Sequence, residues 1–175
     1  VIPGIPIEML AAQLHQSKTD LDVQKTFFYS LLHGIIDKHS DGFDMDTSSL
    51  DDKNRNYTFI SNHRDIVLDP GFLSVGLIDN NFPTTVEIAI GDNLLIYPWI
   101  KKLVRVNKSF IVQRALSMRQ MLESSARMSR YIHFAVTEKK ENVWIAQREG
   151  RAKDSNDRTQ DSVLKMLAMA GEGNI

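Results

Sequence analysis

The chain has 175 residues, a formal net charge of −1 at pH 7, and no cysteine. Its hydrophobic fraction of 42% and charged fraction of 25% are typical of an ordinary globular protein with one core. Because the net charge is close to zero, no global basic field favours nucleic acid, and an anion site has to be a local cluster. The absence of cysteine excludes a thiol nucleophile, a thiolate metal site and a disulfide, and it is compatible with a reducing cytoplasm.

The first 40 residues predict helices, since apolar residues recur in them at helical spacing. The first stripe consists of Ile7, Leu10, Ala11 and Leu14, and the second of Val23, Phe27, Leu31 and Ile35, with Phe28, Leu32 and Ile36 beside it. Residues 39–56 hold many turn formers and predict a loop. No apolar run reaches the roughly 18 residues of a membrane-spanning helix. The start VIPGIPIEML lacks the basic flank and the long apolar stretch of a signal peptide.

From residue 57 onward, short β-rich runs alternate with helical segments. The β-rich runs cover residues 57–61, 84–90, 108–113 and 142–147. The helical segments cover residues 70–79, 92–106 with a break near Pro98, 115–140, and 162–170, where Gly171 is expected to stop the last helix. This alternation predicts an α/β fold: a largely parallel, helix-covered sheet with an N-terminal helical segment.

A polar segment follows each predicted strand. SNHRD follows the first strand, GDN the second, Arg114 the third, and REGRAKDSNDR the fourth. Ligands of parallel α/β sheets bind beyond the carboxyl ends of the strands. We therefore expect these four segments to gather at one edge of the sheet and to form the site there.

His63 comes directly after the first predicted strand, with Asp65 and Asp69 close behind it. An imidazole can accept a proton from an alcohol near neutral pH, and a carboxylate on its other nitrogen fixes the tautomer and the ring orientation. The spacing also fits a second interpretation, in which Asp69 caps the helix begun by Pro70 and His63 is only a partly buried polar residue.

Three blocks, in this order, resemble the glycerolipid acyltransferase superfamily, which includes the 1-acyl-sn-glycerol-3-phosphate and glycerol-3-phosphate acyltransferases. NHRDIVLD resembles the block that opens the catalytic domain of that family, where a His is followed by four residues and an Asp. GDNLLIYPWIKKLVRVNKSFIVQR is similar to the second block, which ends in an apolar strand and an Arg, and WIAQREGRAKD is similar to the third, built around Glu-Gly and basic residues. The resemblance runs from about Phe59 to Lys153, more than half of the chain.

The first block departs from the family pattern in the position of its acid. Four intervening residues after His63 would place Leu68 where the Asp belongs, whereas Asp69 comes one position late and Asp65 comes early. We assign the acid to Asp69 because it lies at the expected helix start, and Asp65 stays open as the alternative. In the third block, Arg148-Glu149-Gly150-Arg151 stands where the family usually has Pro-Glu-Gly-Thr.

The resemblance implies an O-acyltransferase of phospholipid biosynthesis, with His63 as the general base and Asp69 as its partner. The fatty acyl group would come from a thioester, either acyl-CoA or acyl carrier protein, and would go to a hydroxyl of a phosphorylated glycerol or a lysophospholipid. No metal, no cofactor and no nucleic acid partner is implied. The residues expected to bind the acceptor or its phosphate are Arg114, Glu149, Gly150, and Arg151 or Lys153.

Other interpretations of the same segments stay open. Basic and acidic residues alternate in REGRAKDSNDR, as they do in solvated loops. LLIYPWIKKLVRV fits a membrane-surface helix, and it also fits a core helix with one basic face.

The competing function is a non-catalytic lipid- or anion-binding domain on the same scaffold. An α/β hydrolase and a nucleotide-binding protein are disfavoured, since neither a Gly-x-Ser-x-Gly elbow nor a Gly-rich phosphate loop is present.

Two units are expected in the chain. Residues 1–56 form an N-terminal helical segment and loop, and residues 57–175 form the acyltransferase α/β core. We expect this core to be cut short at its C-terminal end, because four strands alone would leave a sheet edge and an apolar face without a cover. The expected location is the cytoplasm, with a peripheral contact at the inner face of the membrane.

Overall fold

The computed structural model describes residues 7–114, 117–154 and 157–171 and contains a four-stranded sheet in the order β1-β4-β2-β3. The strands are β1 (Thr58–Ser61), β2 (Val86–Gly91), β3 (Ser109–Val112) and β4 (Asn142–Ala146). Every pairing is parallel. The predicted α/β fold with a parallel sheet is therefore confirmed, and each strand falls at a predicted β-rich run.

Helices precede the sheet, connect its strands and follow it. The N-terminal elements are α1 (Ile7–Gln16), α2 (Asp20–Val23), the π-helical turn η1 (Gln24–Phe28) and α3 (Tyr29–His39). The connecting and final elements are α4 (Leu68–Asp79), the 3-10 turn η2 (Asp92–Leu94), α5 (Pro98–Val106), α6 (Met118–Thr137) and α7 (Asp161–Ala168). The predicted break near Pro98 is confirmed, because Tyr97 has an extended backbone between η2 and α5.

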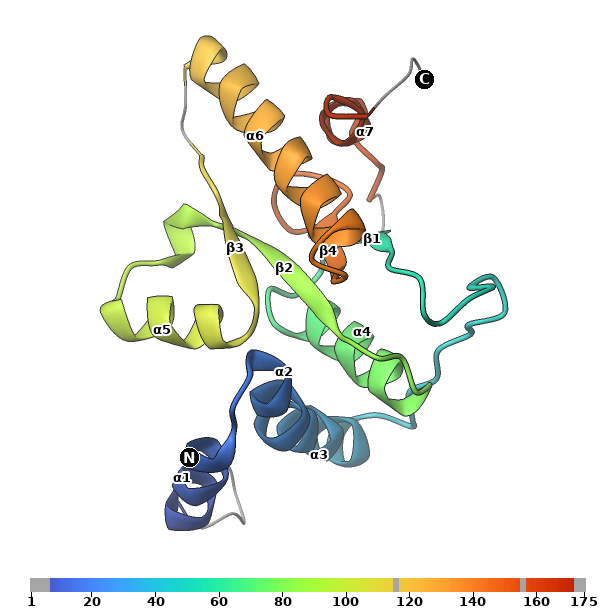
Figure 1. Ribbon diagram of the computed structural model, residues 1–175, viewed down its shortest axis with the longest axis vertical. Coiled ribbons are helices and arrows are strands. Elements are labelled where there is room, and N and C mark those ends of the chain that lie inside the picture. The colour runs from blue at the N-terminus through green and yellow to red at the C-terminus, as the bar shows by residue number, and fades with distance from the viewer. Residues whose placement is uncertain (1–6, 115–116, 155–156, 172–175) are drawn as a thin grey trace.

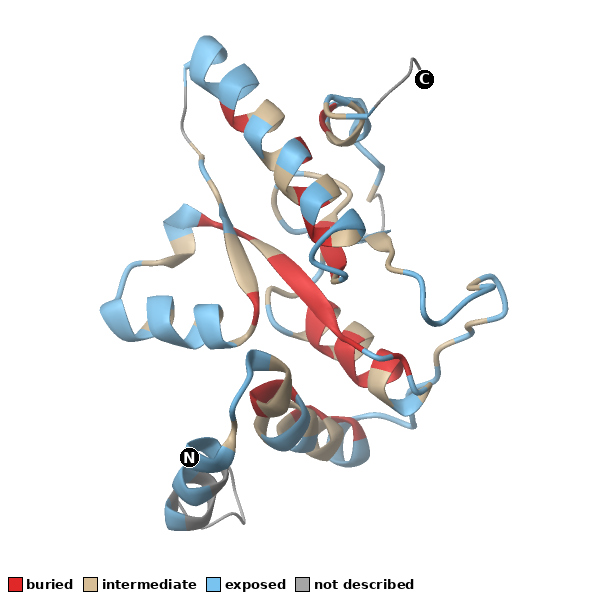
Figure 2. Ribbon diagram, viewed as in Figure 1, coloured by how far each residue is buried: buried red, intermediate tan, exposed pale blue. Residues whose placement is uncertain are grey.

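The molecule is layered, with the sheet between α4 on one face and α6 with α7 on the other (Figure 1). On the α4 face, Leu77, Ile88 and Trp144 belong to one buried apolar cluster. On the opposite face, a second cluster joins Ile132 of α6, Ile145 of β4 and Met166 of α7, among others. The buried face of α4 and the central strand β2 stand out as the interior of the molecule (Figure 2).

The N-terminal helices extend the α4 side of the molecule. Leu32 and Ile36 of α3 pack against Val75 of α4 in a third buried cluster. Gln24 of η1 is also buried and bonds to Asn107 and Thr85, so the N-terminal segment contacts the sheet region directly.

Helix α5 lies on the outside, and the core-helix alternative for this segment is wrong. None of its residues is buried, and Figure 2 shows it exposed along most of its length. Its inward side is limited to residues such as Val104, which packs on the cluster under α4. Within the described ranges, no helix is long and apolar enough to cross a membrane.

The order of the strands determines where a ligand can enter. α4 leaves β1 toward one face of the sheet, whereas the chain after β4 leads to α7 on the other face. β1 and β4 are neighbours, with Ser61 opposite Ala146 at their carboxyl ends. Chains that diverge from adjacent parallel strands open a crevice at that edge, and such crevices hold the ligands of α/β proteins.

Candidate active site

His63 and Asp69 meet at this edge. Nδ1 of His63 lies 3.1 Å from Oδ2 of Asp69, and both side chains are mostly buried. The same carboxylate oxygen accepts the backbone N–H of Arg64 at 2.7 Å and that of Asp65 at 3.0 Å. These bonds fix the carboxylate, so that it can hold the imidazole with a proton on Nδ1 and leave Nε2 as the basic nitrogen.

Asp65 does not contact the imidazole nitrogen, and its side chain instead accepts hydrogen bonds at the start of α4. Its Oδ1 accepts the backbone N–H groups of Val67 and Leu68, both at 2.8 Å. Those two bonds, aided by the nearby charge of Arg151, lower the pKa of Asp65 below its ordinary value. The interpretation in which Asp69 caps the helix is therefore wrong, because Asp65 satisfies the first amides of α4 while Asp69 faces the imidazole.

The loop after β4 holds the backbone of His63 on both sides. The N–H of His63 donates to Oδ2 of Asp157 at 2.9 Å, and its carbonyl oxygen accepts the N–H of Ala152 at 2.7 Å. Arg64 adds a further bond, from Nη1 to the carbonyl oxygen of Asp154 at 3.1 Å. The position of His63 thus depends on residues far from it in the sequence.

Trp144 of β4 forms the floor beneath the imidazole. The two rings meet edge to face, with centroids 5.8 Å apart and an interplanar angle of 67°. Trp144 itself is almost fully buried, and its Nε1 donates to Oγ of Ser61 at 2.9 Å. A buried aromatic floor restricts the imidazole to a few orientations and lowers the local polarity.

Asp157 and Arg148 belong to this arrangement, although the sequence analysis missed both as site residues. Only 2% of the Asp157 side chain is exposed, and its Oδ1 lies 3.8 Å from Nε of Arg148. Within the described part of the chain, Oδ1 has no hydrogen-bond partner. Asp157 is one of several acids in a polar run, and nothing in the local sequence distinguishes it; only the long-range contact with His63 does.

Arg114 and Glu149 lie at the ends of β3 and β4, as the topology predicts. Nη1 of Arg114 lies 3.6 Å from Oε1 of Glu149, and the backbone N–H of Arg114 donates to Oδ1 of Asp92 at 3.3 Å. The arginine side chain crosses closely over Gly91, where a Cβ atom would come within 2.6 Å of Nε. Glycine at position 91 therefore gives Arg114 room to lie across the end of β2.

The remaining predicted residues lie on the loop after Glu149. Gly150 has φ +73°, a backbone conformation that favours glycine, and the space around it is open. The conformation, rather than a close approach, is what requires glycine there. Arg151 is exposed and contributes to the electrostatic environment of Asp65 beside His63, whereas Lys153 is exposed further along the loop.

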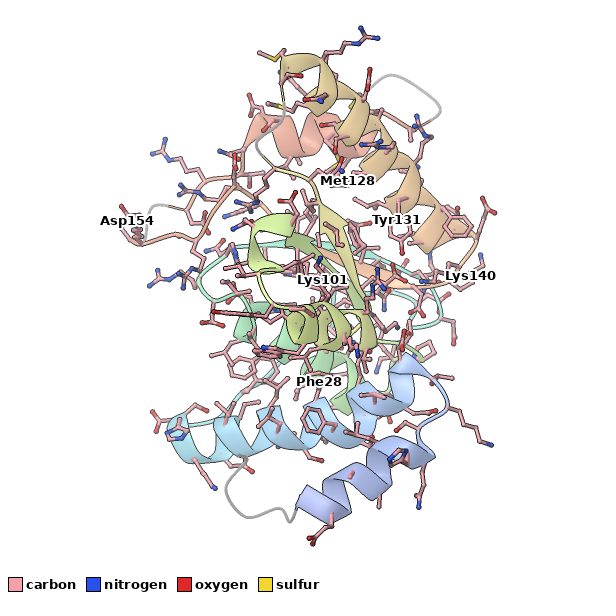
Figure 3. The ribbon with its side chains drawn as sticks, turned by 90° about the vertical axis from the view of Figure 1, so that its left-hand side faces the viewer. Phe28, Lys101, Met128, Tyr131, Lys140 and Asp154 are labelled. Atoms are coloured by element: carbon pink, nitrogen blue, oxygen red, sulfur yellow. The ribbon has the colours of Figure 1, made fainter. Side chains whose placement is uncertain are left out.

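A cavity of about 280 Å³ opens on the α6 face next to these residues. Arg114, Arg148 and Glu149 belong to the polar part of its wall, and Met128 of α6 and Met166 of α7 belong to its apolar part. His63 is not among the lining residues. Figure 3 places Met128 on the stretch of α6 that lies above the sheet.

No cluster of His, Cys, Asp and Glu side chains suited to a metal ion occurs within the described ranges.

The family model named Acyltransferase matches residues 47–170. The chain belongs to the acyltransferase family. Its general activity is thus acyl transfer, which requires an acyl donor and an acceptor. The match covers β1 to α7, and so it includes every site residue described above. No curated protein and no solved structure matches this acyltransferase.

Proposed function

We propose that the protein transfers a fatty acyl group from a thioester to a hydroxyl of a phosphorylated glycerol or a lysophospholipid, with His63 as the general base. The observation that carries the proposal is the contact between Nδ1 of His63 and the mostly buried carboxylate of Asp69. A histidine held in this way presents Nε2 as the base and is stabilised when it becomes an imidazolium.

The chemistry needs no enzyme nucleophile. Nε2 of His63 takes the proton of the acceptor hydroxyl while its oxygen attacks the thioester carbonyl carbon. The tetrahedral intermediate then breaks its carbon–sulfur bond, and the imidazolium returns the proton to the departing sulfur. The products are an ester and a free thiol. A thioester is already activated, which fits a chain without cysteine.

The acceptor phosphate is assigned to the arginines at the strand ends. Arg114 and Arg148 border the cavity, and Arg151 lies on the side of Asp65 and His63. Guanidinium groups bind phosphate through paired, charge-assisted hydrogen bonds. Oε1 of Glu149 lies 3.6 Å from Nη1 of Arg114, so this carboxylate competes with an acceptor phosphate for the guanidinium.

The cavity favours an acceptor that already carries an acyl chain. Its polar wall at Arg114 and Arg148 continues into an apolar wall that contains Met121, Met128 and Met166. A lysophospholipid has its groups in the same order, with a charged phosphate at one end and a hydrocarbon chain at the other. Methionine side chains adapt their shape to flexible apolar ligands, which suits this use.

A panel of acceptors tests the proposal. The protein is incubated with acyl-CoA or acyl carrier protein together with glycerol 3-phosphate, a lysophosphatidic acid, or glycerol without phosphate, and the release of free thiol is followed. We expect release only with the phosphorylated acceptors, and none with His63→Ala. Binding of these ligands by the wild-type protein without thiol release would instead identify a non-catalytic lipid-binding domain and would refute the proposal.

A further inference from the structure

Helix α5 and the turn before it carry apolar side chains that face solvent. Ile96 is 75% exposed, Trp99 is 62% exposed, and Tyr97 is 57% exposed. Leu103 and Val106, further along the helix, are exposed as well. Figure 3, which views the molecule from this side, shows no other element in front of α5. The exposed side chains thus form an apolar surface without a partner among the described residues.

This surface is distinct from the side of α5 that packs on the protein. Ile100 and Val104 are half-buried and face inward. Trp99, Leu103 and Val106 are spaced by four and three residues, which places them on one stripe of a helix. The packing of α5 on the core therefore explains Ile100 and Val104, and it leaves the second stripe unexplained.

The apolar stripe is bordered by cations. Lys101, Lys102 and Arg105 are exposed, and they form no ion pair with a described residue. No Asp or Glu occurs in the sequence between Asp92 and Glu123. A tryptophan-containing apolar stripe next to lysines and arginine is the arrangement of helices that lie in the interface of an anionic bilayer.

The position of this surface relates it to the site. η2 begins at Asp92, directly after β2, and Asp92 accepts the backbone N–H of Arg114. Ile96 and Tyr97 follow within one short turn. The exposed apolar turn therefore lies near the carboxyl-terminal end of the sheet, where Arg114 and the segment after β1 also lie.

We propose that residues 94–106 dock the protein on an anionic phospholipid surface, with the side chains of Ile96, Trp99 and Leu103 among the lipid headgroups and Lys101, Lys102 and Arg105 on the lipid phosphates. This docking goes beyond the proposed acyl transfer and rests only on the exposed surface of α5. The negative surface potential of the lipids would complement the local positive charge.

Vesicle co-sedimentation tests the docking without any acyl donor or lysolipid, so its failure would be independent of the failure of the catalytic proposal. The full chain is mixed with vesicles of phosphatidylcholine, or of phosphatidylcholine with phosphatidylglycerol. We expect strong binding only to the anionic vesicles, and weaker binding as salt is added. Lack of binding to anionic vesicles at low salt overturns the proposal, even if α5 binds another protein.

Variants identify the surface. Trp99→Ser with Leu103→Ser should weaken binding about tenfold or more. Lys101→Ala with Lys102→Ala should weaken it about 25-fold, since each cation contributes about a factor of five. The matched controls are Leu122→Ser and Arg119→Ala on α6, whose side chains are also well exposed. Equal weakening by the controls and by the α5 variants would overturn the proposal.

Tryptophan fluorescence gives a second readout, which is made first on the wild-type protein and then on one conservative variant. The chain has two tryptophans, exposed Trp99 and buried Trp144. Brominated lipids in anionic vesicles should quench Trp99, and Trp99→Phe should abolish the quenching. Quenching that persists in Trp99→Phe would show that another surface enters the lipid, and it would refute the assignment.

Discussion

The backbone N–H of His63 donates a 2.9 Å hydrogen bond to Oδ2 of Asp157, a residue 94 positions further along the chain. The carboxylate is almost completely buried, and its other oxygen faces Arg148 at 3.8 Å. One acid thus connects the loop after β1, which holds the imidazole, to the loop after β4, which holds an arginine at the cavity. We infer that the two loops are positioned as a unit.

Asp157 should act as a positioning residue. Asp157→Ala leaves the buried N–H of His63 unpaired, so we expect kcat to fall about tenfold or more with little change in KM for the acyl donor. Asp157→Asn keeps an oxygen for that N–H and should retain most of kcat. Steady-state kinetics on both variants, with melting temperatures measured in parallel, check this. Equal losses of kcat in the two variants would contradict the positioning role.

His63→Ala should reduce acyl transfer by about a hundredfold or more, the usual contribution of a positioned general base. The substitution removes a mostly buried ring that contacts Trp144 edge to face, so a change in stability is measured separately by thermal unfolding. His63→Gln fills a similar volume without a basic nitrogen and should be equally inactive. Near wild-type turnover in either folded variant would exclude His63 as the base.

The two neighbouring acids should respond differently to amide substitution. Asp69→Asn cannot stabilise the imidazolium and can favour the wrong tautomer, so we expect a loss of turnover of about a hundredfold or more. Asp65→Asn still offers an oxygen to the N–H groups of Val67 and Leu68, and turnover should stay within a few-fold of wild type. Rates of thiol release at saturating donor compare the two, and a larger loss for Asp65→Asn would reverse the assignment.

The sequence predicts most of the scaffold and only part of the site, for physical reasons. The parallel sheet follows from β-rich runs alternating with helical segments, and the edge at which His63, Arg114 and Glu149 lie follows from parallel strand direction. These are local patterns combined with one topological rule. They do not depend on knowing which side chains touch.

The missed features depend on contacts between distant segments. Asp157 is one of several acids in a polar loop, and it differs from the others only in its bond to His63. The extra residue between His63 and Asp69 makes the spacing compatible with either Asp65 or Asp69 as the partner of the imidazole. The turn at Asp65, which brings Asp69 back to Nδ1, decides between them, and this turn is a property of the folded chain. Periodicity likewise could not separate a core helix from a surface helix at α5, because both place apolar residues at helical spacing.

Asp65 should contribute to stability in a pH-dependent way. Its pKa is lowered from the ordinary value of 3.8, first by the backbone N–H groups of Leu68 and Val67. The contribution is therefore fully present above pH 3.8 and is lost as the pH falls through the lower pKa of the folded state. Asp65→Ala should cost about 1 kcal/mol of unfolding free energy at pH 7, as loss of a helix cap does.

Urea unfolding of the wild-type protein and of Asp65→Ala at several pH values measures that difference. It should be constant from pH 7 to pH 5 and should shrink below pH 3.8, because the carboxylate is protonated there first in the unfolded state and, at lower pH, in the folded state. Asp44→Ala, which replaces an exposed acid in the loop before β1, is the control and should show no such cost. A difference that stays constant down to pH 2 would contradict the role of the Asp65 carboxylate as the acceptor for the N–H groups of Val67 and Leu68.

Arg114 provides the sharpest test of acceptor recognition. It lies at the cavity wall, 3.6 Å from Glu149, and its side chain crosses over Gly91. Arg114→Ala removes a guanidinium without touching the His63–Asp69 pair, so KM for a phosphorylated acceptor should rise about tenfold or more while KM for the acyl donor changes little.

Arg114→Lys keeps the charge and loses the paired geometry, so its acceptor KM should lie between those of the wild type and of Arg114→Ala. Glu149→Gln removes the competing carboxylate and should leave acceptor KM unchanged or lower. Equal increases in the KM of donor and acceptor in Arg114→Ala would show that Arg114 supports the whole site rather than the acceptor phosphate.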